Sequence, residues 1–379
     1  AYGSVQRKGT LDHVIEQLSG RSPDQLDPPV LAALRLGLFQ LCFLDGVAAH
    51  AAVDGSVELV KQDLPRATGI VNAVLRKAAR SGHALVDALP DETPEQAAIA
   101  HSAPLWLAEL WFEHLGPSDA RALLAASNAP AEHALRANTL VTSAEALAEQ
   151  LPVASHLGPE PPEAVVADEP FDAHGSPLFA AGALLPQSRA SQLVARAVAP
   201  QAGERVLDLC AAPGGKTTHL AALMGDDGEI VAVERNAQRA EQLTATAQRL
   251  RASIVSVVKA DAAAFTADRP FDRALVDPPC SGLGTLRSRP DLRWRSGPEQ
   301  IEGLVGEQAA ILDAAAAALR PGGRLVYSSC TISPRENEDQ VAAFLERHGD
   351  FALDGEPRTT LPHRDGTDGF FIAGLIRRV

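Results

Sequence analysis

The sequence predicts an α/β protein in three parts. From about residue 203 onward, strand patterns alternate regularly with helical ones, which is typical of a mostly parallel, doubly wound sheet. Up to about residue 128 the pattern stays helical, and a stretch rich in Pro and Gly with short strand candidates separates the two regions. We therefore expect a helical domain in 1–82, a helical linker and small α/β module in 83–180, and an α/β domain in 181–379.

The N-terminal part has the pattern of a helical bundle. Asp27 is a plausible N-cap, and Pro28-Pro29 opens a helix that continues over 30–44. This stretch is apolar on nearly all sides, so we expect it to be the central helix. Amphipathic helices are predicted over 47–63 and 65–81.

The remaining elements follow from periodicity and turn residues. In the small module we predict strands at 134–139 and 164–166 and a helix at 143–151, and a helix over 187–198 leads into the last domain. In that domain the predicted strands cover 205–210, 229–234, 254–260, 271–276 and 323–329, and the helices 217–224, 237–251 and 299–319. Ser333-Pro-Arg-Glu336 has the pattern of a capping box, so a further helix is predicted from there to about His348.

Composition narrows the class of protein. With 46% hydrophobic and 22% charged residues, the 379-residue chain is an ordinary globular sequence. It has no signal-peptide pattern and no apolar run of about twenty residues, so we expect a cytoplasmic protein without a membrane partner. The net charge of −14 argues against nonspecific coating of nucleic acid. Four cysteines lie far apart without a CxxC, so we expect neither a metal site nor a disulfide framework.

The stretch Asp277-Pro-Pro-Cys280 is the first candidate for chemistry. It follows a predicted buried strand, and two prolines cannot continue a sheet ladder. A carboxylate and a thiol therefore lie at the carboxyl edge of the sheet, where open α/β sheets bind ligands. The alternative is a cysteine that only fills a small apolar space.

The turn Cys210–Lys216 is the second candidate. Its small residues would let backbone N–H groups approach a ligand at the start of a helix. The sequence Gly215-Lys216-Thr217 suggests a P-loop, but that motif requires glycine at position 210, which is Cys. The turn is also not G-x-G-x-x-G, so neither an NTPase nor a nicotinamide enzyme is favoured.

Three acidic residues follow successive predicted strands. Glu234, Asp261 and Asp277 each stand at or just after a strand end, and Glu234 comes about twenty residues after the turn, the spacing of a ribose-binding carboxylate. Together with the turn they predict a site for adenosine with an attached polar group. S-adenosylmethionine is such a ligand.

At this point a resemblance becomes specific. Leu209–Thr218, Val276–Gly284, Tyr327–Thr331 with Glu336-Asn-Glu338, and Asp368-Gly-Phe-Phe371 resemble the Nol1/Nop2/Sun family of RNA cytosine-C5 methyltransferases. Upstream, Tyr2–Arg7, Gly37–Leu41 and Gly69–Arg76 resemble the NusB-like domain of its bacterial RsmB (Sun) branch. The first helices of that domain are missing and the first residue is Ala1, so we expect the chain to be truncated at its N-terminus. The resemblance implies a Rossmann-like methyltransferase domain preceded by an all-α NusB-like domain and a small α/β module.

The resemblance also implies roles for individual residues. It makes Cys330 the nucleophile, Cys280 the residue that assists release, and Asp277 the partner of the cytosine ring edge. Two cysteines suit this chemistry, because cytosine C5 is too poor a nucleophile unless a thiolate first adds at C6, and the C5 proton must afterwards leave. S-adenosylmethionine would be held by Cys210, Ala211, Ala212, Pro213, Gly214, Gly215, Lys216, Glu234, Asp261 and Asp277.

An arginine-rich segment follows the Cys280 turn. Arginine binds phosphate well and a tryptophan can stack on a base. We therefore predict RNA contacts from Arg287, Arg289, Arg293, Trp294 and Arg295, although a solvated loop would have the same composition. Cytosine inside a duplex is unreachable, so the target must be single-stranded, looped or flipped out.

Taken together, the sequence predicts C5-methylation of a cytosine in 16S ribosomal RNA, with S-adenosylmethionine as cofactor and a monomeric enzyme. The substrate rests on the resemblance. Two alternatives are an exocyclic-amine RNA methyltransferase, since an Asp-Pro-Pro-aromatic turn serves that chemistry, and a noncatalytic NusB-like RNA-binding factor. Cys280 in the place of the aromatic residue, together with the second cysteine, argues against the amine enzyme.

Overall fold

The structure is a computed structural model that describes residues 2–379, and it divides into two compact units. Unit 1 contains the chain up to Ala129 together with Arg289–Arg295, and unit 2 contains Pro130–Ser288 and Ser296–Val379. The division falls inside the 83–180 segment of the sequence. The helices of this segment that end by Ala126 belong to unit 1, whereas its strands and the short helices between them belong to unit 2.

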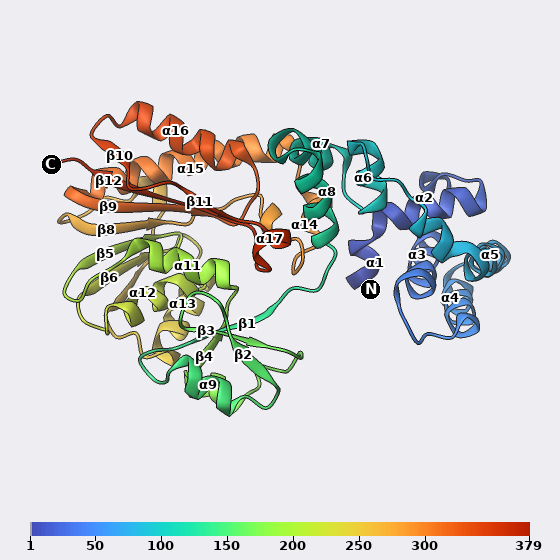
Figure 1. The fold of residues 1–379 in the computed structure, drawn as a ribbon, viewed down its shortest axis with the longest axis horizontal. Coiled ribbons are helices and arrows are strands. Elements are labelled where there is room, and N and C mark those ends of the chain that lie inside the picture. Colours follow the sequence, from blue (N-terminus) through green and yellow to red (C-terminus); the bar gives the residue numbers. More distant parts are fainter. Residues whose placement is uncertain (1) are drawn as a thin grey trace. The chain divides into compact units, whose positions relative to one another are not determined.

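Unit 1 is helical throughout. Its helices are α1 Tyr2–Gln6, α2 Lys8–Ser19, α3 Pro28–Phe43, α4 Ala49–Asp63, α5 Thr68–Asp87, α6 Pro94–Ala100, α7 Leu105–Leu115, α8 Pro117–Ala126 and the single turn α14 Leu292–Arg295 (Figure 1). The predicted central helix is α3, whose Leu34 and Leu38 are fully buried against Leu75 of α5 and other apolar side chains. Helix α5 begins at Thr68 because Pro65–Ala67 forms a separate 3₁₀ turn.

The small module of unit 2 is an antiparallel sheet of four strands. Its strands are β1 His133–Ala137, β2 Ser155–Leu157, β3 Ala164–Ala167 and β4 Leu184–Pro186, in the order β2-β3-β1-β4. The helices α9 Ala144–Gln150 and α10 Pro177–Ala180 lie in the connections between these strands. Buried leucines on this sheet, among them Leu135 and Leu184, pack with Leu147 of α9 to form a core of their own.

The large sheet of unit 2 has eight strands. They are β5 Arg205–Leu209, β6 Glu229–Val233, β7 Val255–Val258, β8 Phe271–Val276, β9 Leu319–Ser329, β10 Phe351–Leu353, β11 Arg358–Thr360 and β12 Phe370–Arg377, in the order β10-β12-β9-β8-β5-β6-β7 with β11 beside β12. Strands β5 to β9 are parallel, whereas β12 runs antiparallel to β9. The predicted parallel sheet is therefore confirmed, and the sequence analysis missed β10, β11 and β12.

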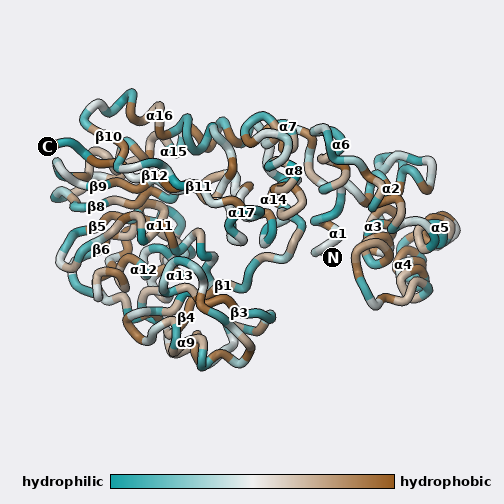
Figure 2. The backbone as a smooth tube through the Cα atoms, viewed as in Figure 1, coloured by the Kyte–Doolittle hydropathy of each residue, from teal (hydrophilic) through white to brown (hydrophobic). Residues whose placement is uncertain are grey.

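Helices cover both faces of the large sheet (Figure 1). On one face α11 Arg189–Val198, α12 Gly215–Leu223 and α13 Ala237–Arg249 contribute to a core that includes Val206. On the other face α15 Pro298–Ala318 and α16 Glu338–Arg347 pack over the neighbouring Leu207. Successive strand residues point to opposite faces, so strands covered on both sides are apolar at most positions, with Asp208 in β5 among the exceptions. Figure 2 shows this predominantly hydrophobic sheet. The carboxyl ends of the parallel strands consequently share one edge.

One local prediction is wrong. The Ser333 side chain forms no cap hydrogen bond, and Pro334–Glu336 is a 3₁₀ turn from which α16 starts only at Glu338. The glutamate that would have completed the capping box is fully buried and accepts hydrogen bonds from Ser281 instead. A tertiary contact has displaced the local one.

Candidate active site

The predicted site residues meet at the carboxyl edge of the large sheet. Cys210 follows β5, Glu234 follows β6, Asp277 follows β8 and Cys330 follows β9. Parallel neighbours in this sheet end at the same level, because Leu209 pairs with Val233 and with Val276, and Val276 pairs with Tyr327. Residues more than a hundred positions apart in the chain are thereby brought together, at the position expected for a ligand site.

The Cys210–Lys216 turn connects β5 to α12. Gly214 adopts φ 100°, and a Cβ there would lie 2.7 Å from Leu243 Cδ1, so only glycine fits without strain. Helix α12 starts directly after it, which leaves the unpaired N–H groups of the first turn at the edge of the sheet. Such a turn suits the polar end of a nucleoside ligand.

A narrow pocket beside this turn is acidic. It is lined by Cys210, Glu234, Asp261 and apolar residues such as Ile311. Glu234 is almost completely buried and accepts a hydrogen bond of 2.8 Å from the N–H of Asn236, which fixes its carboxylate at the end of β6. Arg239 Nη1 lies 3.5 Å from Glu234 Oε2, and Arg239 and Arg235 also line this pocket. A buried carboxylate at a strand end is suited to accept hydrogen bonds from the hydroxyl groups of a ribose.

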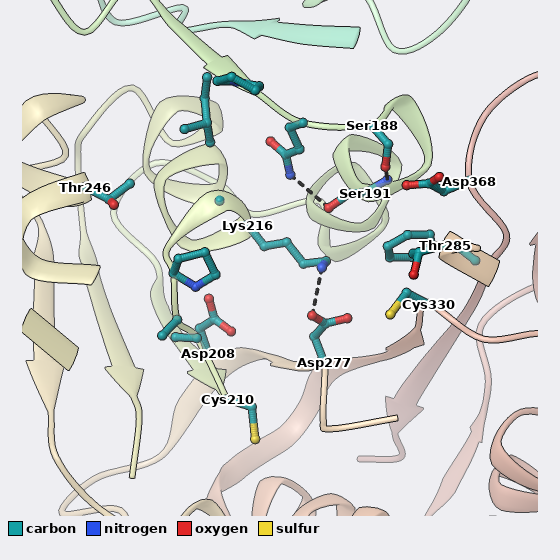
Figure 3. A pocket seen from close by; sticks show the side chains of 18 of the residues that line it. Ser188, Ser191, Asp208, Cys210, Lys216, Thr246, Asp277, Thr285, Cys330 and Asp368 are labelled. Atoms are coloured by element: carbon teal, nitrogen blue, oxygen red, sulfur yellow. Dashed lines mark hydrogen bonds and ion pairs between the residues drawn. The ribbon is translucent and has the colours of Figure 1, made fainter. Parts of the chain in front are cut away.

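A second, larger cavity of about 560 Å³ adjoins the same turn. Its lining includes Lys216, Asp277, Cys330 and Asp368, whose side chains point into it in Figure 3. Cys210 borders both cavities. Cys210 therefore lies between the acidic strand ends and the larger cavity.

Lys216 and Asp277 form an ion pair in the larger cavity. Lys216 Nζ lies 2.7 Å from Asp277 Oδ2 (Figure 3). The Ser328 hydroxyl donates to Asp277 Oδ1 at 2.7 Å. Burial alone would lower the pKa of Lys216, but the charge of Asp277 and its hydrogen bond outweigh burial and raise that pKa. The ammonium group therefore stays charged, and the charge of a Cys330 thiolate adds to this effect.

The two cysteines predicted to be catalytic are in contact. Cys280 Sγ and Cys330 Sγ lie 3.2 Å apart, and neither is part of a disulfide. Cys330 lines the larger cavity, whereas Cys280 lies behind it and is not part of the lining. The hydrogen bond with Cys330, followed by burial, raises the pKa of Cys280 well above its usual range. The pair thus presents one thiol to a substrate and a second within reach of the first.

Burial also raises the pKa of two groups at or just before the start of the Cys210–Lys216 turn, here called the cofactor turn. It raises the pKa of Cys210 to about 12, with contributions from the charges of Asp277 and Asp208, so this thiol stays neutral. It raises the pKa of Asp208 to about 7, although the Thr217 hydroxyl donates a hydrogen bond of 2.7 Å to Oδ2. Asp208 was not among the predicted site residues, because an aspartate inside an apolar strand gives no signal of its environment.

The arginine-rich segment is only partly available to a ligand. Arg293 is 1% exposed and donates to the Ser102 and Ser127 carbonyls of unit 1, which corrects its prediction as an RNA contact. The Trp294 indole N–H donates to the Val5 carbonyl, so this ring also serves packing within the unit. Arg289 and Arg295 are exposed.

Arg287, in unit 2, donates hydrogen bonds to the carbonyls of Pro130 and Gly366.

Two further observations concern the whole described chain. Among residues 2–379, no group of three His, Cys, Asp or Glu side chains is arranged to hold a metal ion. Within the same residues, every helix is too short or too polar to cross a membrane.

Comparison with known proteins identifies the family. Residues 195–376 match the 16S rRNA methyltransferases RsmB/F, 1–80 match the NusB family, and 103–174 match the ferredoxin-like domain of RsmF/B-like methyltransferases. A probable ribosomal RNA small subunit methyltransferase B of Synechocystis is 38% identical, covering 99% of this chain and 89% of that protein. The chain belongs to the RsmB family of methyltransferases. Ribosomal RNA small subunit methyltransferase B of Vibrio cholerae is 36% identical over 100% of this chain and 88% of its own length.

Solved structures agree with this assignment. The crystal structure of PH0851 superposes with a TM-score of 0.80 at 29% identity, covering 98% of this chain and 87% of that one. NSun6 from Pyrococcus horikoshii with SFG has a TM-score of 0.65 at 24% identity, covering 77% and 99% of the two chains, and shows the shared fold. The protein is an S-adenosylmethionine-dependent methyltransferase with a NusB domain, a ferredoxin-like module and a Rossmann-like catalytic domain.

Proposed function

We propose that this protein methylates C5 of a cytosine in 16S ribosomal RNA through a covalent adduct between Cys330 and C6 of the base. The observation that carries the proposal is the pair of thiols 3.2 Å apart beside Asp277, with one of them lining the larger cavity. The names of the relatives support ribosomal RNA of the small subunit as the substrate.

Bound S-adenosylmethionine supplies the methyl group, and the Cys210–Lys216 turn with Glu234 and Asp261 would hold it. The remaining steps belong to this chain. Cys330 adds as a thiolate to C6, breaks the C5=C6 double bond and places electron density on C5. C5 would then take the methyl group as the bond between that methyl and the cofactor's sulfur breaks, leaving a neutral thioether. The charged Lys216 favours the thiolate, because opposite charges stabilise each other in a partly buried site.

Release requires a base for the C5 proton. Cys280 is the candidate, since it lies next to Cys330. Its raised pKa means that the thiol must first lose its own proton, after which its thiolate would be a strong acceptor for the C5 proton. Removal of that proton restores the C5=C6 double bond and expels the Cys330 thiolate from C6. Asp277, held by Ser328 and Lys216, would hydrogen-bond the edge of the ring and stabilise the adduct.

The RNA contacts remain part of the proposal. Arg289 and Arg295 are exposed and can pair with phosphate, whereas the Arg293 guanidinium and the Trp294 indole N–H are used inside unit 1. Phosphate contacts of this kind position RNA without selecting the target base.

The test uses wild type, Cys330→Ala and Cys280→Ala with labelled S-adenosylmethionine and unmodified small-subunit RNA, analysed on denaturing gels. We expect Cys280→Ala to accumulate a covalent protein–RNA adduct, because the adduct forms but is not resolved. Cys330→Ala should give neither adduct nor 5-methylcytosine. An adduct with Cys330→Ala would exchange the two roles, and methylation by both variants would exclude the covalent mechanism.

A further inference from the structure

A buried hydrogen-bond network joins the two turns that carry the thiols. The backbone N–H of Ser281, directly after Cys280, donates to Glu336 Oε1 at 2.8 Å, and the Ser281 hydroxyl donates to Oε2 at 2.5 Å. The same hydroxyl lies 2.6 Å from the hydroxyl of Thr331, directly after Cys330. One carboxylate therefore holds the Cys280 turn and, through Ser281, the Cys330 turn.

Helix α15 and strand β9 complete the network. Gln308 Nε2 donates to Glu336 Oε1 at 3.1 Å and to the Pro279 carbonyl at 3.0 Å, while the Tyr327 hydroxyl donates to the Glu336 carbonyl at 2.6 Å. Glu336, Gln308 and Tyr327 are each 0% exposed. Because a buried donor without an acceptor costs free energy, these bonds favour one arrangement of the two turns.

We propose that Glu336 is a positioning residue that sets the spacing of the two thiols. This inference rests on the proposed two-cysteine function and assigns the alignment of Cys280 with Cys330 to a residue outside the cavity. Glu336 does not line either cavity beside the cofactor turn, and its carboxylate contacts donors of the protein itself. It acts by holding the Cys280 turn in place.

A competing role would be that of a proton acceptor, and one substitution separates the two roles. In Glu336→Gln the amide oxygen can accept from the Ser281 N–H and from Gln308, while the amide N–H₂ donates to the Ser281 hydroxyl. That hydroxyl can rotate and donate to Thr331, so the links from position 336 to Ser281 and Gln308 are kept without the charge. Glu336→Ala removes the link altogether.

The spacing can be measured without RNA. Diamide oxidises two neighbouring thiols to a disulfide and takes up the two protons and two electrons that they lose, so the rate of the Cys280–Cys330 disulfide reports their alignment. We expect Glu336→Ala to slow both this reaction and single-turnover methylation at least about tenfold. Glu336→Gln should stay within about threefold of wild type in both assays. Mass spectrometry of the linked peptides identifies the pair.

Controls show whether the effect is local. Glu338→Gln changes an exposed glutamate two residues later and should behave as wild type. Affinity for S-adenosylmethionine, measured by calorimetry, should be unchanged in all variants, because Glu336 does not line the pocket that contains Glu234. If Glu336→Ala does not fold, Ser281→Ala removes only the hydroxyl link and should slow disulfide formation by more than the roughly threefold range allowed for Glu336→Gln.

Two results would overturn the proposal. One is a wild-type disulfide rate in Glu336→Ala. The other is a Glu336→Gln variant that loses methylation as fully as Glu336→Ala while its disulfide rate stays normal, which would make the charge essential. Should the product be something other than 5-methylcytosine while the disulfide rates change as expected, the proposed function fails and the positioning role of Glu336 stands.

Discussion

The carboxyl edge of the large sheet has two halves that are built differently. In the cofactor half, defined as the Cys210–Lys216 turn with Glu234 and Asp261, the two carboxylates accept local hydrogen bonds, Glu234 from Asn236 and Asp261 from Ala263, whereas the turn also accepts a bond from Arg136. The thiol half, defined as the turns that carry Cys280 and Cys330, is fixed by residues from distant elements. The carboxylates of the nucleoside site are held by residues close to them in sequence, whereas the alignment of the two thiols depends on residues far apart in the chain.

Backbone contacts show the same contrast. Within the thiol half, Gly284 donates its N–H to the Cys330 carbonyl at 3.0 Å and accepts from the Gly369 N–H at 2.8 Å. Three chain segments, from β8, β9 and the start of β12, are thus joined at one glycine. A disturbance in any of them should reach the thiols.

The largest effect is expected from breaking the bond between the two halves. Asp277→Ala removes the partner of Lys216 and the acceptor of Ser328, leaving a partly buried ammonium without its ion pair. We expect kcat to fall about 10³-fold, because a fixed charge beside the reacting base is lost, while affinity for S-adenosylmethionine changes less than about tenfold. Single-turnover rates and calorimetry measure the two quantities. A kcat above about a tenth of wild type would show that the halves act independently.

A matched pair of glycine substitutions compares the effect of a new side chain in the thiol half with its effect in helix α15. In Gly284→Ala the new Cβ would collide with the Gly369 carbonyl oxygen, so we expect about 1–3 kcal/mol of destabilisation and slower adduct formation. Gly303→Ala lies in α15 with open space around it and should be neutral or stabilising by up to about 1 kcal/mol. Thermal unfolding and adduct gels are the measurements. If the two variants lost equal stability and formed the adduct equally fast, the thiol half would be no more sensitive than helix α15, and the proposed difference would be wrong.

The cofactor half should depend on pH through Asp208. Its pKa is raised to about 7 by burial from an ordinary value of 3.8, so the folded domain favours the protonated form. The resulting stability is complete below pH 3.8 and is lost as pH rises to about 7. Asp208→Asn lacks this dependence, and between pH 5 and 7 wild type should lose about 2–3 kcal/mol relative to the variant. Unfolding of both proteins across this pH range tests it, and parallel curves would refute it.

The smallest effect is expected at Asp261. Its side chain is exposed and accepts a local hydrogen bond from Ala263, so the fold does not depend on it. Asp261→Ala should raise KM for S-adenosylmethionine about three- to tenfold and leave kcat nearly unchanged, since a binding contact is lost equally in ground and transition states. An altered kcat with an unchanged KM would show that Asp261 acts on the chemical step and not on cofactor binding.

Local patterns predicted some elements well and others poorly. The parallel strands β5 to β9 and the turn at Gly214 follow from apolar runs and small residues that act within a few positions. Strands β10 and β11 have three residues each, too short to stand out, and the apolar run of β12 was not distinguished from other buried segments. The buried guanidinium of Arg293 has the same sequence context as its exposed neighbours.

The sequence by itself determined the α/β class, the order of the parallel strands along the chain and the identity of the turns, because periodicity and turn chemistry act over short distances. The resemblance of its motifs marked the two cysteines. Only the tertiary structure decided that the two thiols are in contact and that Glu336 accepts hydrogen bonds from Ser281 instead of forming a capping box. It also decided that Asp208 is buried, which raises its pKa to about 7. Contact, burial and dielectric environment arise from residues far apart in the chain, and no local pattern contains them.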